Sequence, residues 1–397
     1  MEATYPDLVI LGSTGSVGTQ AADVARAHGI RVKGLSAHRN AVLVEEQARL
    51  FHPEFCVMDD PDAARDLRVR LSDTPVRVLC GTDGIVEMLN GVTADGPNGL
   101  VVENSILGEA GLIPTLETLK AGWNLALANK ESLVVGGELV MPLAREKGLK
   151  ILPVDSEHCA IFQCLRAGRP SEIEQIWLTA SGGPFYGYDK EQLRSVTLEQ
   201  TLKHPTWQMG AKITVDSATL MNKGFEVIEA VHLFGVRPDQ IRVVVHRESM
   251  IHSMVEYIDH SIIAQMSVPD MRHCVQYALT HPCRGTAGNT VSRLDLFEVG
   301  KMTFARPDTE TFPLLALAVS CIEAGGALPA VLNAANEEVV AAFLHGELPF
   351  YRIAEAVSLV VERSAYASRV HGLDGILECD RAARLEAKSV LGCMSLS

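Results

Sequence analysis

Short apolar segments alternate with amphipathic segments along the first 150 residues. Residues 8–11 are four apolar residues in a row, which suits a strand buried on both faces of a parallel sheet. An amphipathic helix is predicted after them, through Val24, and segments of both kinds follow as far as "KILPVDSE". This alternation predicts an α/β fold with a doubly wound parallel sheet.

The pattern changes beyond residue 156. Three strands are predicted over 240–246, 253–259 and 261–269, as parts of a mixed sheet in an α+β domain. From about Phe312 the apolar positions recur at helical spacing. We therefore expect four segments: an N-terminal sheet domain (1–155), a mixed-sheet domain (156–285), a linker (286–310) and a C-terminal α-helical domain (311–397).

Composition narrows the class of protein. The 397 residues are 47% hydrophobic and 21% charged, which is typical of a globular protein. The net charge of −14 argues against a nucleic-acid or membrane-surface partner. No apolar run is long enough to span a bilayer, and the N-terminus lacks the basic start of a secretory signal. Nine scattered cysteines without a C-x-x-C pair indicate reduced thiols in a cytoplasmic protein.

A glycine-rich turn follows the first predicted strand. Gly12, Gly15 and Gly18 are spaced G-x-x-G-x-x-G, whereas the commoner fingerprint is G-x-G-x-x-G. Glycines at such a turn let backbone N–H groups approach a pyrophosphate at the N-terminus of the next helix. The segment therefore predicts a Rossmann-like dinucleotide-binding domain.

The end of the second predicted strand favours one cofactor over the other. NAD sites usually place an acidic residue about 20 residues after the glycines, to hold the ribose 2′-hydroxyl. Here His38, Arg39 and Asn40 occupy that region, and a guanidinium suits a 2′-phosphate. NADP is therefore the favoured cofactor, with a simple solvated loop role for Arg39 as the alternative.

Two acidic residues follow the apolar stretch "ILPV". On an extended segment alternate side chains share a face, so Asp155 and Glu157 are expected to point the same way. For an isolated pair of this kind, a solvated strand end is the commoner explanation. However, "ALANKES" and "VDSEH" both lie at carboxyl ends of predicted strands, where ligands gather in a doubly wound sheet.

A second polar group lies in the stretch 204–235. Asn222, Lys223 and Glu226 lie three and four residues apart, so a helix places them on one face. The alternative is a helical ion pair between Lys223 and Glu226. Ser181 begins a Gly-Gly-Pro turn that either binds an anion or only reverses the chain. Trp207 belongs either to a satellite core contact or to a lid over a ligand.

Seven motifs of this sequence resemble one enzyme family in the order of that family. They are "GSTGSVG", "LANKESLV", "VDSEH", "SGGPF", "HPTWQMG", "VDSATLMNKGFEVIEA" and "LNAANEEVVAAFL". The sequence is similar in these motifs to the 1-deoxy-D-xylulose 5-phosphate reductoisomerases, over about residues 8 to 345. One departure is His38-Arg39-Asn40, where the family commonly has Gly-Lys-Asn.

The resemblance implies an activity and a set of site residues. It implies rearrangement and NADPH-dependent reduction of 1-deoxy-D-xylulose 5-phosphate to 2-C-methyl-D-erythritol 4-phosphate, with Mg²⁺ or Mn²⁺, by a homodimer. It also implies that residues 156–285 form the catalytic, substrate-binding and dimerisation domain, with a flap near 204–210. By resemblance, the metal ligands are Asp155, Glu157 and Glu226, which with Lys130 form the catalytic set. Lys130, Glu157 and Glu226 are also expected to contact substrate, together with Ser156, Ser181, His204, Trp207, Met209, Ser217, Asn222 and Lys223. The NADPH contacts are expected to be Thr14, Gly15, Ser16, Val17, Arg39, Asn40, Asn129, Glu131 and Gly210.

That chemistry explains the acidic pair. A hard dication polarises the ketose carbonyl and lowers the pKa of the adjacent hydroxyl, and three carboxylates suit Mg²⁺ or Mn²⁺. A cation between Asp155 and Glu157 removes their mutual repulsion. Two alternatives remain, namely an NADPH-dependent sugar-phosphate reductase without rearrangement and a nucleotide-sensing regulator. Neither of them requires three metal carboxylates.

Overall fold

The computed structural model describes residues 5–96, 98–207, 209–286 and 291–395. The chain divides into two compact units, and each contains segments that are distant in sequence. The first unit comprises residues 1–132, 140–159 and 270–293, and the second comprises 133–139, 160–269 and 294–397. The domain boundaries expected from sequence remain a prediction.

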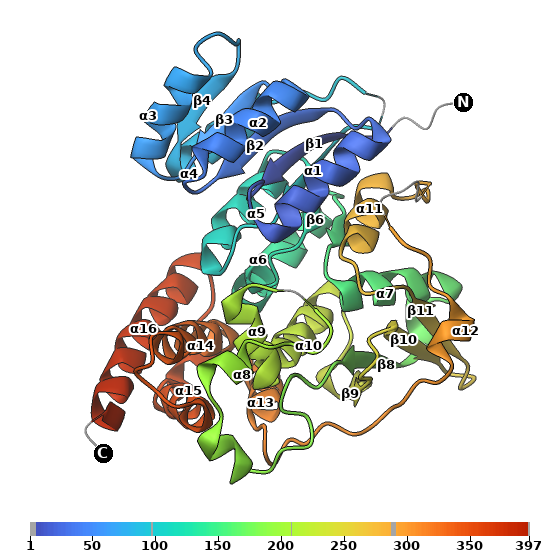
Figure 1. The fold of residues 1–397 in the computed structure, drawn as a ribbon, viewed down its shortest axis with the longest axis vertical. Coiled ribbons are helices and arrows are strands. Elements are labelled where there is room, and N and C mark those ends of the chain that lie inside the picture. Colours follow the sequence, from blue (N-terminus) through green and yellow to red (C-terminus); the bar gives the residue numbers. More distant parts are fainter. Residues whose placement is uncertain (1–4, 97, 208, 287–290, 396–397) are drawn as a thin grey trace. The chain divides into compact units, whose positions relative to one another are not determined.

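The first unit contains a seven-stranded sheet (Figure 1). Its strands are β1 (Asp7–Leu11), β2 (Val32–Ala37), β3 (Phe55–Met58), β4 (Arg77–Cys80), β5 (Leu100–Asn104), β6 (Asn124–Leu127) and β7 (Ile151–Pro153). All pairings are parallel, in the order β4-β3-β2-β1-β5-β6-β7. The strand order reverses beside β1, where a doubly wound sheet binds its ligands. The predicted fold class is confirmed.

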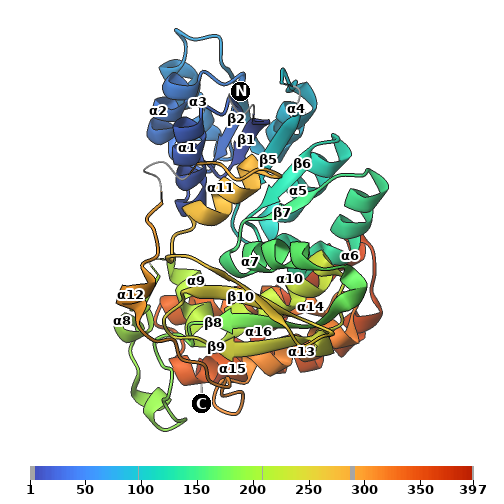
Figure 2. The ribbon, with the colours of Figure 1, turned by 90° about the vertical axis from the view of Figure 1, so that its right-hand side faces the viewer.

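Helices cover both faces of this sheet (Figure 2). One face carries α1 (Ser16–His28), α2 (Ala41–Phe51) and α3 (Pro61–Arg70), and the other carries α4 (Gly81–Gly91) and α5 (Leu112–Lys120). Val9, Leu11, Val57, Met88 and Val102 belong to the core beneath α4. A late segment, α11 (Arg272–Thr280), packs against α1 within the same unit.

The second unit contains a mixed four-stranded sheet. Its strands are β8 (Ile173–Ala180), β9 (Ile241–Val245), β10 (Ile251–Tyr257) and β11 (Ile262–Met266), in the order β11-β10-β8-β9. The β8–β9 pair is parallel, and β10 runs antiparallel to both β8 and β11. The three strands predicted in 240–269 are confirmed within a few residues at each end.

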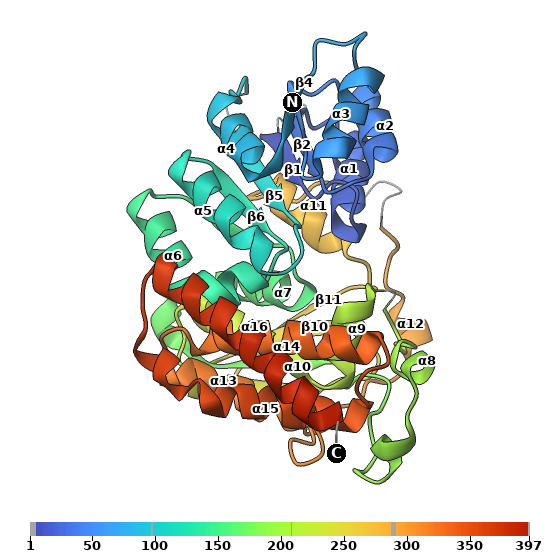
Figure 3. The ribbon, with the colours of Figure 1, turned by 90° about the vertical axis from the view of Figure 1, so that its left-hand side faces the viewer.

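The second unit also contains α-helices joined by irregular segments (Figure 3). The α-helices that lie wholly within it are α8 (Leu198–Thr201), α9 (Ala211–Ala218), α10 (Met221–Phe234), α12 (Leu296–Val299), α13 (Leu314–Ala324), α14 (Leu328–Leu344), α15 (Ile353–Arg363) and α16 (Leu373–Ser395). Helix α14 packs against α15 and α16, and α13 packs against α10. The predicted C-terminal helices are confirmed. Residues 287–290 of the predicted linker lie outside the described residues, and its described part is irregular apart from α12.

One local prediction is wrong. The strand β7 ends at Pro153, and α7 (Ser156–Cys164) begins three residues later. Asp155 Oδ1 accepts hydrogen bonds from the backbone N–H groups of Glu157 (3.0 Å) and His158 (3.3 Å), so Asp155 caps this helix. Asp155 and Glu157 therefore do not share a face of an extended segment, because the chain is already helical at Ser156.

None of the described helices has the length and hydrophobicity needed to cross a membrane.

Candidate active site

The glycine-rich turn between β1 and α1 has the backbone geometry of an anion site. Gly12 adopts a φ of +86°, which only glycine adopts readily. A Cβ atom on Gly18 would lie 2.2 Å from the carbonyl oxygen of Gly12, so glycine is also required where α1 meets the turn. No side chain among the described residues caps α1, so the N–H groups of its first turn are available to an anion. Thr14 and Gly15 lie in this turn, Ser16 and Val17 begin α1, and the contact of these four residues with NADPH remains a prediction.

Two neighbouring elements hold the turn in place. The carbonyl oxygen of Ser36, in β2, accepts from the N–H groups of Gly12 (3.0 Å) and Ser13 (2.8 Å). The buried Gln47, in α2, donates from Nε2 to the carbonyl oxygen of Ser13 at 2.9 Å. The sequence analysis did not identify Gln47, because a polar residue at a helical core position gives no signal of its partner.

The segment after β2 contains the residues expected at the ribose end of NADPH. Asn40 caps α2, where its Oδ1 accepts from Leu43 N–H at 3.1 Å. Arg39 donates from Nε to Asp60 Oδ2 at 2.9 Å, although 71% of its side chain is exposed. His38 Nε2 lies 3.6 Å from Asp59 Oδ2. Arg39 is thus solvated, as the alternative stated, and also ion-paired, and its cofactor role remains a prediction.

Two expected NADPH contacts lie after β6. The buried Asn129 donates from Nδ2 to the carbonyl oxygens of Ile106 (2.6 Å) and Gly108 (2.8 Å) and to Glu131 Oε2 (3.2 Å). Asn129 Oδ1 accepts from Ser132 N–H at 2.8 Å. The amide of Asn129 therefore holds the loop after β5 against the start of α6 (Glu131–Glu146).

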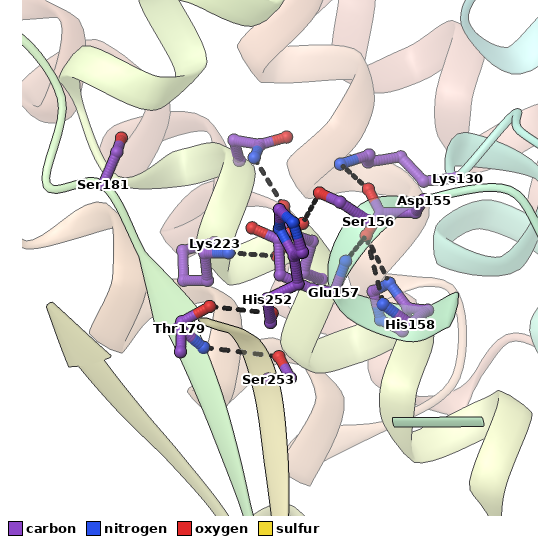
Figure 4. Close-up of polar contacts among 12 residues, drawn as sticks. Lys130, Asp155, Ser156, Glu157, His158, Thr179, Ser181, Lys223, His252 and Ser253 are labelled. Carbon is purple, nitrogen blue, oxygen red and sulfur yellow. Dashed lines mark hydrogen bonds and ion pairs between the residues drawn. The ribbon is translucent and has the colours of Figure 1, made fainter. Parts of the chain in front are cut away.

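Lys130 and Asp155 meet at the carboxyl ends of the parallel neighbours β6 and β7 (Figure 4). Lys130 Nζ donates to Asp155 Oδ2 at 3.2 Å, and only 10% and 13% of the two side chains is exposed. The buried His158 places Nδ1 2.9 Å from Asp155 Oδ1. Ser156 Oγ donates to Glu157 Oε2. Neighbouring side chains thus orient the carboxylates of both Asp155 and Glu157.

The polar face predicted over residues 222–226 is present on α10. Leu220 has a φ of +61°, which separates α9 from α10. Asn222 Nδ2 donates to Glu226 Oε1 at 2.6 Å, and Lys223 Nζ donates to Glu226 Oε2. Lys223 and Glu226 are 4% and 1% exposed. The ion pair is therefore real, but it is buried, and a buried charged pair costs desolvation energy that a solvated helical pair does not.

The residues expected at the phosphate end lie around the turn after β8. Ser181 Oγ lies 3.0 Å from His204 Nε2. Burial, with the charge of Arg247 adding to it, lowers the pKa of His204 to about 4. Ser217 lies in α9, whose N-cap is Gly210. A Cβ atom on Gly183 would lie 2.6 Å from the carbonyl oxygen of Ser217, so the turn packs on this helix.

The predicted flap is described except for Gln208, which lies outside the described residues. The ring of the half-buried Trp207 lies 6.2 Å from that of His252, and Met209 is half-buried. Trp207 N–H donates to His204 Nδ1 at 2.9 Å, so this hydrogen bond links Trp207 to a residue that is expected beside the phosphate. Whether Trp207 and Met209 close over a ligand remains a prediction.

In the part of the chain that the structure describes, one group of three acidic side chains can hold a metal ion: Asp155, Glu157 and Glu226. This is the set that the family resemblance implies. All three offer carboxylate oxygens, and such a donor set suits Mg²⁺ or Mn²⁺ rather than zinc or copper. The donor chemistry of this chain therefore fits the expected metal.

A further buried acid lies beside the dinucleotide turn. Glu103, on β5, is fully buried and accepts from Ser105 Oγ at 3.2 Å, while its Oε1 has no hydrogen-bond partner among the described residues. Burial raises the pKa of Glu103 to about 8. The sequence analysis did not identify Glu103, because nothing in the pattern distinguishes it from a solvated strand end.

The fold and these polar groups define a dinucleotide-dependent enzyme with a carboxylate site for a divalent metal ion. Three family models match the chain: 1-deoxy-D-xylulose 5-phosphate reductoisomerase over residues 8–137, the C-terminal domain of the same enzyme over 151–234, and the DXP reductoisomerase C-terminal domain over 266–386. The chain belongs to the 1-deoxy-D-xylulose 5-phosphate reductoisomerase family.

Relatives support this assignment along nearly the whole chain. The 1-deoxy-D-xylulose 5-phosphate reductoisomerase of Acetivibrio thermocellus is 50% identical over 375 residues, which cover 94% of this chain and 96% of the relative. That of Caldanaerobacter subterraneus is 48% identical, over 95% and 97% of the two chains. The solved structure of the Zymomonas mobilis reductoisomerase in complex with NADPH has a TM-score of 0.90 and 39% identity, covering 98% of this chain and 99% of the other. A reductoisomerase in complex with NADPH, fosmidomycin and magnesium has a TM-score of 0.89 and 36% identity, covering 98% of both chains.

Proposed function

We propose that this protein converts 1-deoxy-D-xylulose 5-phosphate into 2-C-methyl-D-erythritol 4-phosphate, with NADPH as reductant and one Mg²⁺ or Mn²⁺ ion. The observation that carries the proposal is the acidic set Asp155, Glu157 and Glu226 in a chain of this family. Neither a plain sugar-phosphate reductase nor a nucleotide-sensing regulator requires three metal carboxylates. The solved structures of reductoisomerases in complex with NADPH and with magnesium support the same two cofactors.

In the proposed site Asp155, Glu157 and Glu226 would hold the metal ion, and a bound dication would supply polarisation of the ketose carbonyl and a lower pKa of the adjacent hydroxyl. Lys130, already within 3.2 Å of Asp155 Oδ2, places a positive charge beside the ligands and is proposed to contact a substrate oxygen. Ser156 is proposed to contact the substrate beside them. Lys130 and Glu226 are buried and the other three groups are half-buried, and limited contact with bulk water strengthens electrostatic interactions with substrate oxygens.

We assign the phosphate end of the substrate to Ser181, Ser217, Asn222 and Lys223, with His204 beside them. Lys223 is the buried cation of this group, and its Nζ already donates to Glu226 Oε2. A bound phosphate would place a second anion beside this cation, and the binding of such a non-reacting group helps to drive closure of the segment 204–210, with Trp207 and Met209 over the ligand. NADPH is assigned to Thr14–Val17, Arg39, Asn40, Asn129, Glu131 and Gly210, and it supplies the hydride.

The test is oxidation of NADPH by the purified protein in the presence of 1-deoxy-D-xylulose 5-phosphate, followed by absorbance, with and without a chelator. We expect oxidation that the chelator abolishes and that added Mg²⁺ or Mn²⁺ restores. Oxidation that persists in the chelator would favour a plain sugar-phosphate reductase. A protein that binds NADPH but never oxidises it would favour a nucleotide-sensing regulator.

We also propose a cytoplasmic homodimer. Its nine cysteines, all within the described residues, form no disulfide, which suits a reducing compartment. The edge strand β11 exposes Ile262 and Ile263, and an exposed apolar edge is a typical surface for a second copy. Light scattering coupled to size-exclusion chromatography tests the stoichiometry, and a mass near 43 kDa, that of one chain, would contradict the dimer.

A further inference from the structure

Two parallel strands of the second unit end side by side. Ala180 at the end of β8 is paired with Val245 at the end of β9, and His246 N–H donates to the carbonyl oxygen of Ala180 at 2.8 Å. The residues that follow each strand are therefore neighbours. The turn 181–183 follows β8 and is part of the proposed phosphate site. Arg247 follows β9.

Arg247 binds both ends of this turn. Its Nη1 donates to the carbonyl oxygen of Ser181 at 2.8 Å and to that of Gly183 at 2.7 Å. The guanidinium carbon lies 5.0 Å from the ring centre of Tyr186, which follows the same turn. A single side chain thus fixes the turn at two backbone atoms and packs on the residue beyond it.

These contacts decide which backbone groups the turn can offer to an anion. Carbonyl oxygens repel a phosphate, whereas N–H groups attract it. The carbonyl oxygens of Ser181 and Gly183 both accept hydrogen bonds from the guanidinium of Arg247. Gly182 and Gly183 have φ values of +78° and +69°, which permit the tight reversal of the chain. The turn is consequently held with its repulsive groups facing Arg247.

Hydrogen bonds from two neighbouring groups also orient the hydroxyl of Ser181. His204 Nδ1 accepts from the backbone N–H groups of Thr206 (3.2 Å) and Trp207 (2.9 Å), so we assign the ring proton to Nε2. Nε2–H then donates to Ser181 Oγ, which also accepts from Gly183 N–H at 3.3 Å. With both acceptor positions of Ser181 Oγ in use, its own hydrogen is the group left to donate to a ligand.

We propose that Arg247 is a positioning residue for substrate, which fixes the turn 181–183 so that Ser181 donates its hydroxyl hydrogen to the phosphate group. The inference rests on the proposed function, since it takes Ser181 as a phosphate contact. Arg247 itself acts through the turn, and its positive charge adds to the attraction of the site for an anion.

The experiment compares Arg247→Met with Arg242→Met in steady-state assays of the full-length protein. Arg242 is an exposed arginine on β9, five residues before Arg247, and serves as the matched control. For Arg247→Met we expect the KM for the sugar phosphate to rise about tenfold with kcat changed less than about threefold, because charge-assisted contacts to the turn are lost. Inhibition by inorganic phosphate, competitive with the sugar phosphate, is expected to weaken by a similar factor. Arg242→Met is expected to match the wild type.

Two further variants separate the outcomes. Arg247→Lys retains the charge and a donor, and we expect its KM to lie between those of the Arg247→Met and wild-type proteins, which also covers the case in which Arg247→Met fails to fold. Ser181→Ala tests the premise, and we expect it to raise the KM. An unchanged KM and unchanged phosphate inhibition in the Arg247 variants, with Ser181→Ala impaired, would overturn the role of Arg247 alone. An unchanged KM in Ser181→Ala would overturn the proposed phosphate site and this inference with it.

Discussion

Lys223 donates from Nζ to Oε2 of Glu226, one turn further along α10, and both side chains are almost completely buried. Asn222 Nδ2 donates to Oε1 of the same carboxylate, so both oxygens of Glu226 accept hydrogen bonds from side chains of this helix. The same helix thus orients a proposed metal ligand and a proposed phosphate contact at once.

The role of Glu226 as a metal ligand gives the first prediction. Glu226→Gln retains the shape of the side chain and an acceptor for Lys223, but removes the negative charge. We expect turnover to fall more than about a thousandfold, because the metal supplies several kcal/mol of transition-state stabilisation. NADPH binding, measured by nucleotide fluorescence, should be unchanged. Glu229→Gln is the control, since Glu229 is equally buried on the same helix. Loss of NADPH binding in Glu226→Gln would indicate misfolding instead.

The role of Lys223 is tested separately. We expect Lys223→Ala to raise the KM for the sugar phosphate about thirtyfold, because a buried charge-assisted contact contributes about 2 kcal/mol. The control is Lys388→Ala, since Lys388 lies on α16 in an exposed pair with Glu338 at 3.6 Å. Unchanged kinetics in Lys223→Ala would assign Lys223 to a purely structural ion pair with Glu226.

Gln47 provides a prediction for the cofactor end. Gln47→Leu leaves the carbonyl oxygen of Ser13 without its side-chain donor, and an unsatisfied buried acceptor costs about 1–3 kcal/mol. We expect the glycine-rich turn to loosen and the Kd for NADPH to rise about tenfold, with the KM for the sugar phosphate unchanged. Fluorescence titration with NADPH measures this, and Glu46→Ala, at an exposed position of α2, is the control. An unaltered Kd would show that β2 holds the turn by itself.

Glu103 makes stability depend on pH. Burial raises the pKa of Glu103 to about 8 in the folded protein. The unfolded chain has an ordinary glutamate pKa of about 4.3, so between these values the folded state binds the additional proton. The free energy of unfolding is therefore expected to fall by about 2–4 kcal/mol from pH 5 to pH 8 on account of this group. Glu103→Gln cannot ionise and should give a flatter pH profile in urea unfolding, whereas Glu46→Gln should follow the wild type. Parallel profiles for wild type and Glu103→Gln would contradict the raised pKa.

Much of the fold follows from local pattern. The apolar run 8–11 and the glycines after it place β1 and α1 correctly, because a strand buried on both faces and a glycine-rich turn have distinct signals. The helix α11 belongs to the first unit although residues 160–269, which belong to the second, separate it from the rest, and no local sequence pattern predicts this. The segment 155–157 was expected to be extended because its apolar approach resembles a longer strand, whereas the capping bonds of Asp155 start a helix there.

In the candidate site, the residues with reactive side chains were predictable from sequence, whereas the residues that hold backbone groups in place were not. Asp155, Lys130 and Glu226 have side chains that chemistry singles out, and the family motifs contain them. Arg247 and Gln47 act on backbone carbonyl oxygens, so their partners carry no side-chain signal. The parallel register of β8 and β9, which brings Arg247 to the turn 181–183, is not visible before the sheet is known.

The most direct measurement is the position of a manganese ion in crystals of the protein, from its anomalous scattering. We predict one peak about 2.1 Å from carboxylate oxygens of Asp155, Glu157 and Glu226 together, as in an oxygen-only site. The peak should disappear in Glu226→Gln crystals grown with the same metal. A manganese peak elsewhere, or one that contacts none of these three carboxylates, would contradict the proposed metal site.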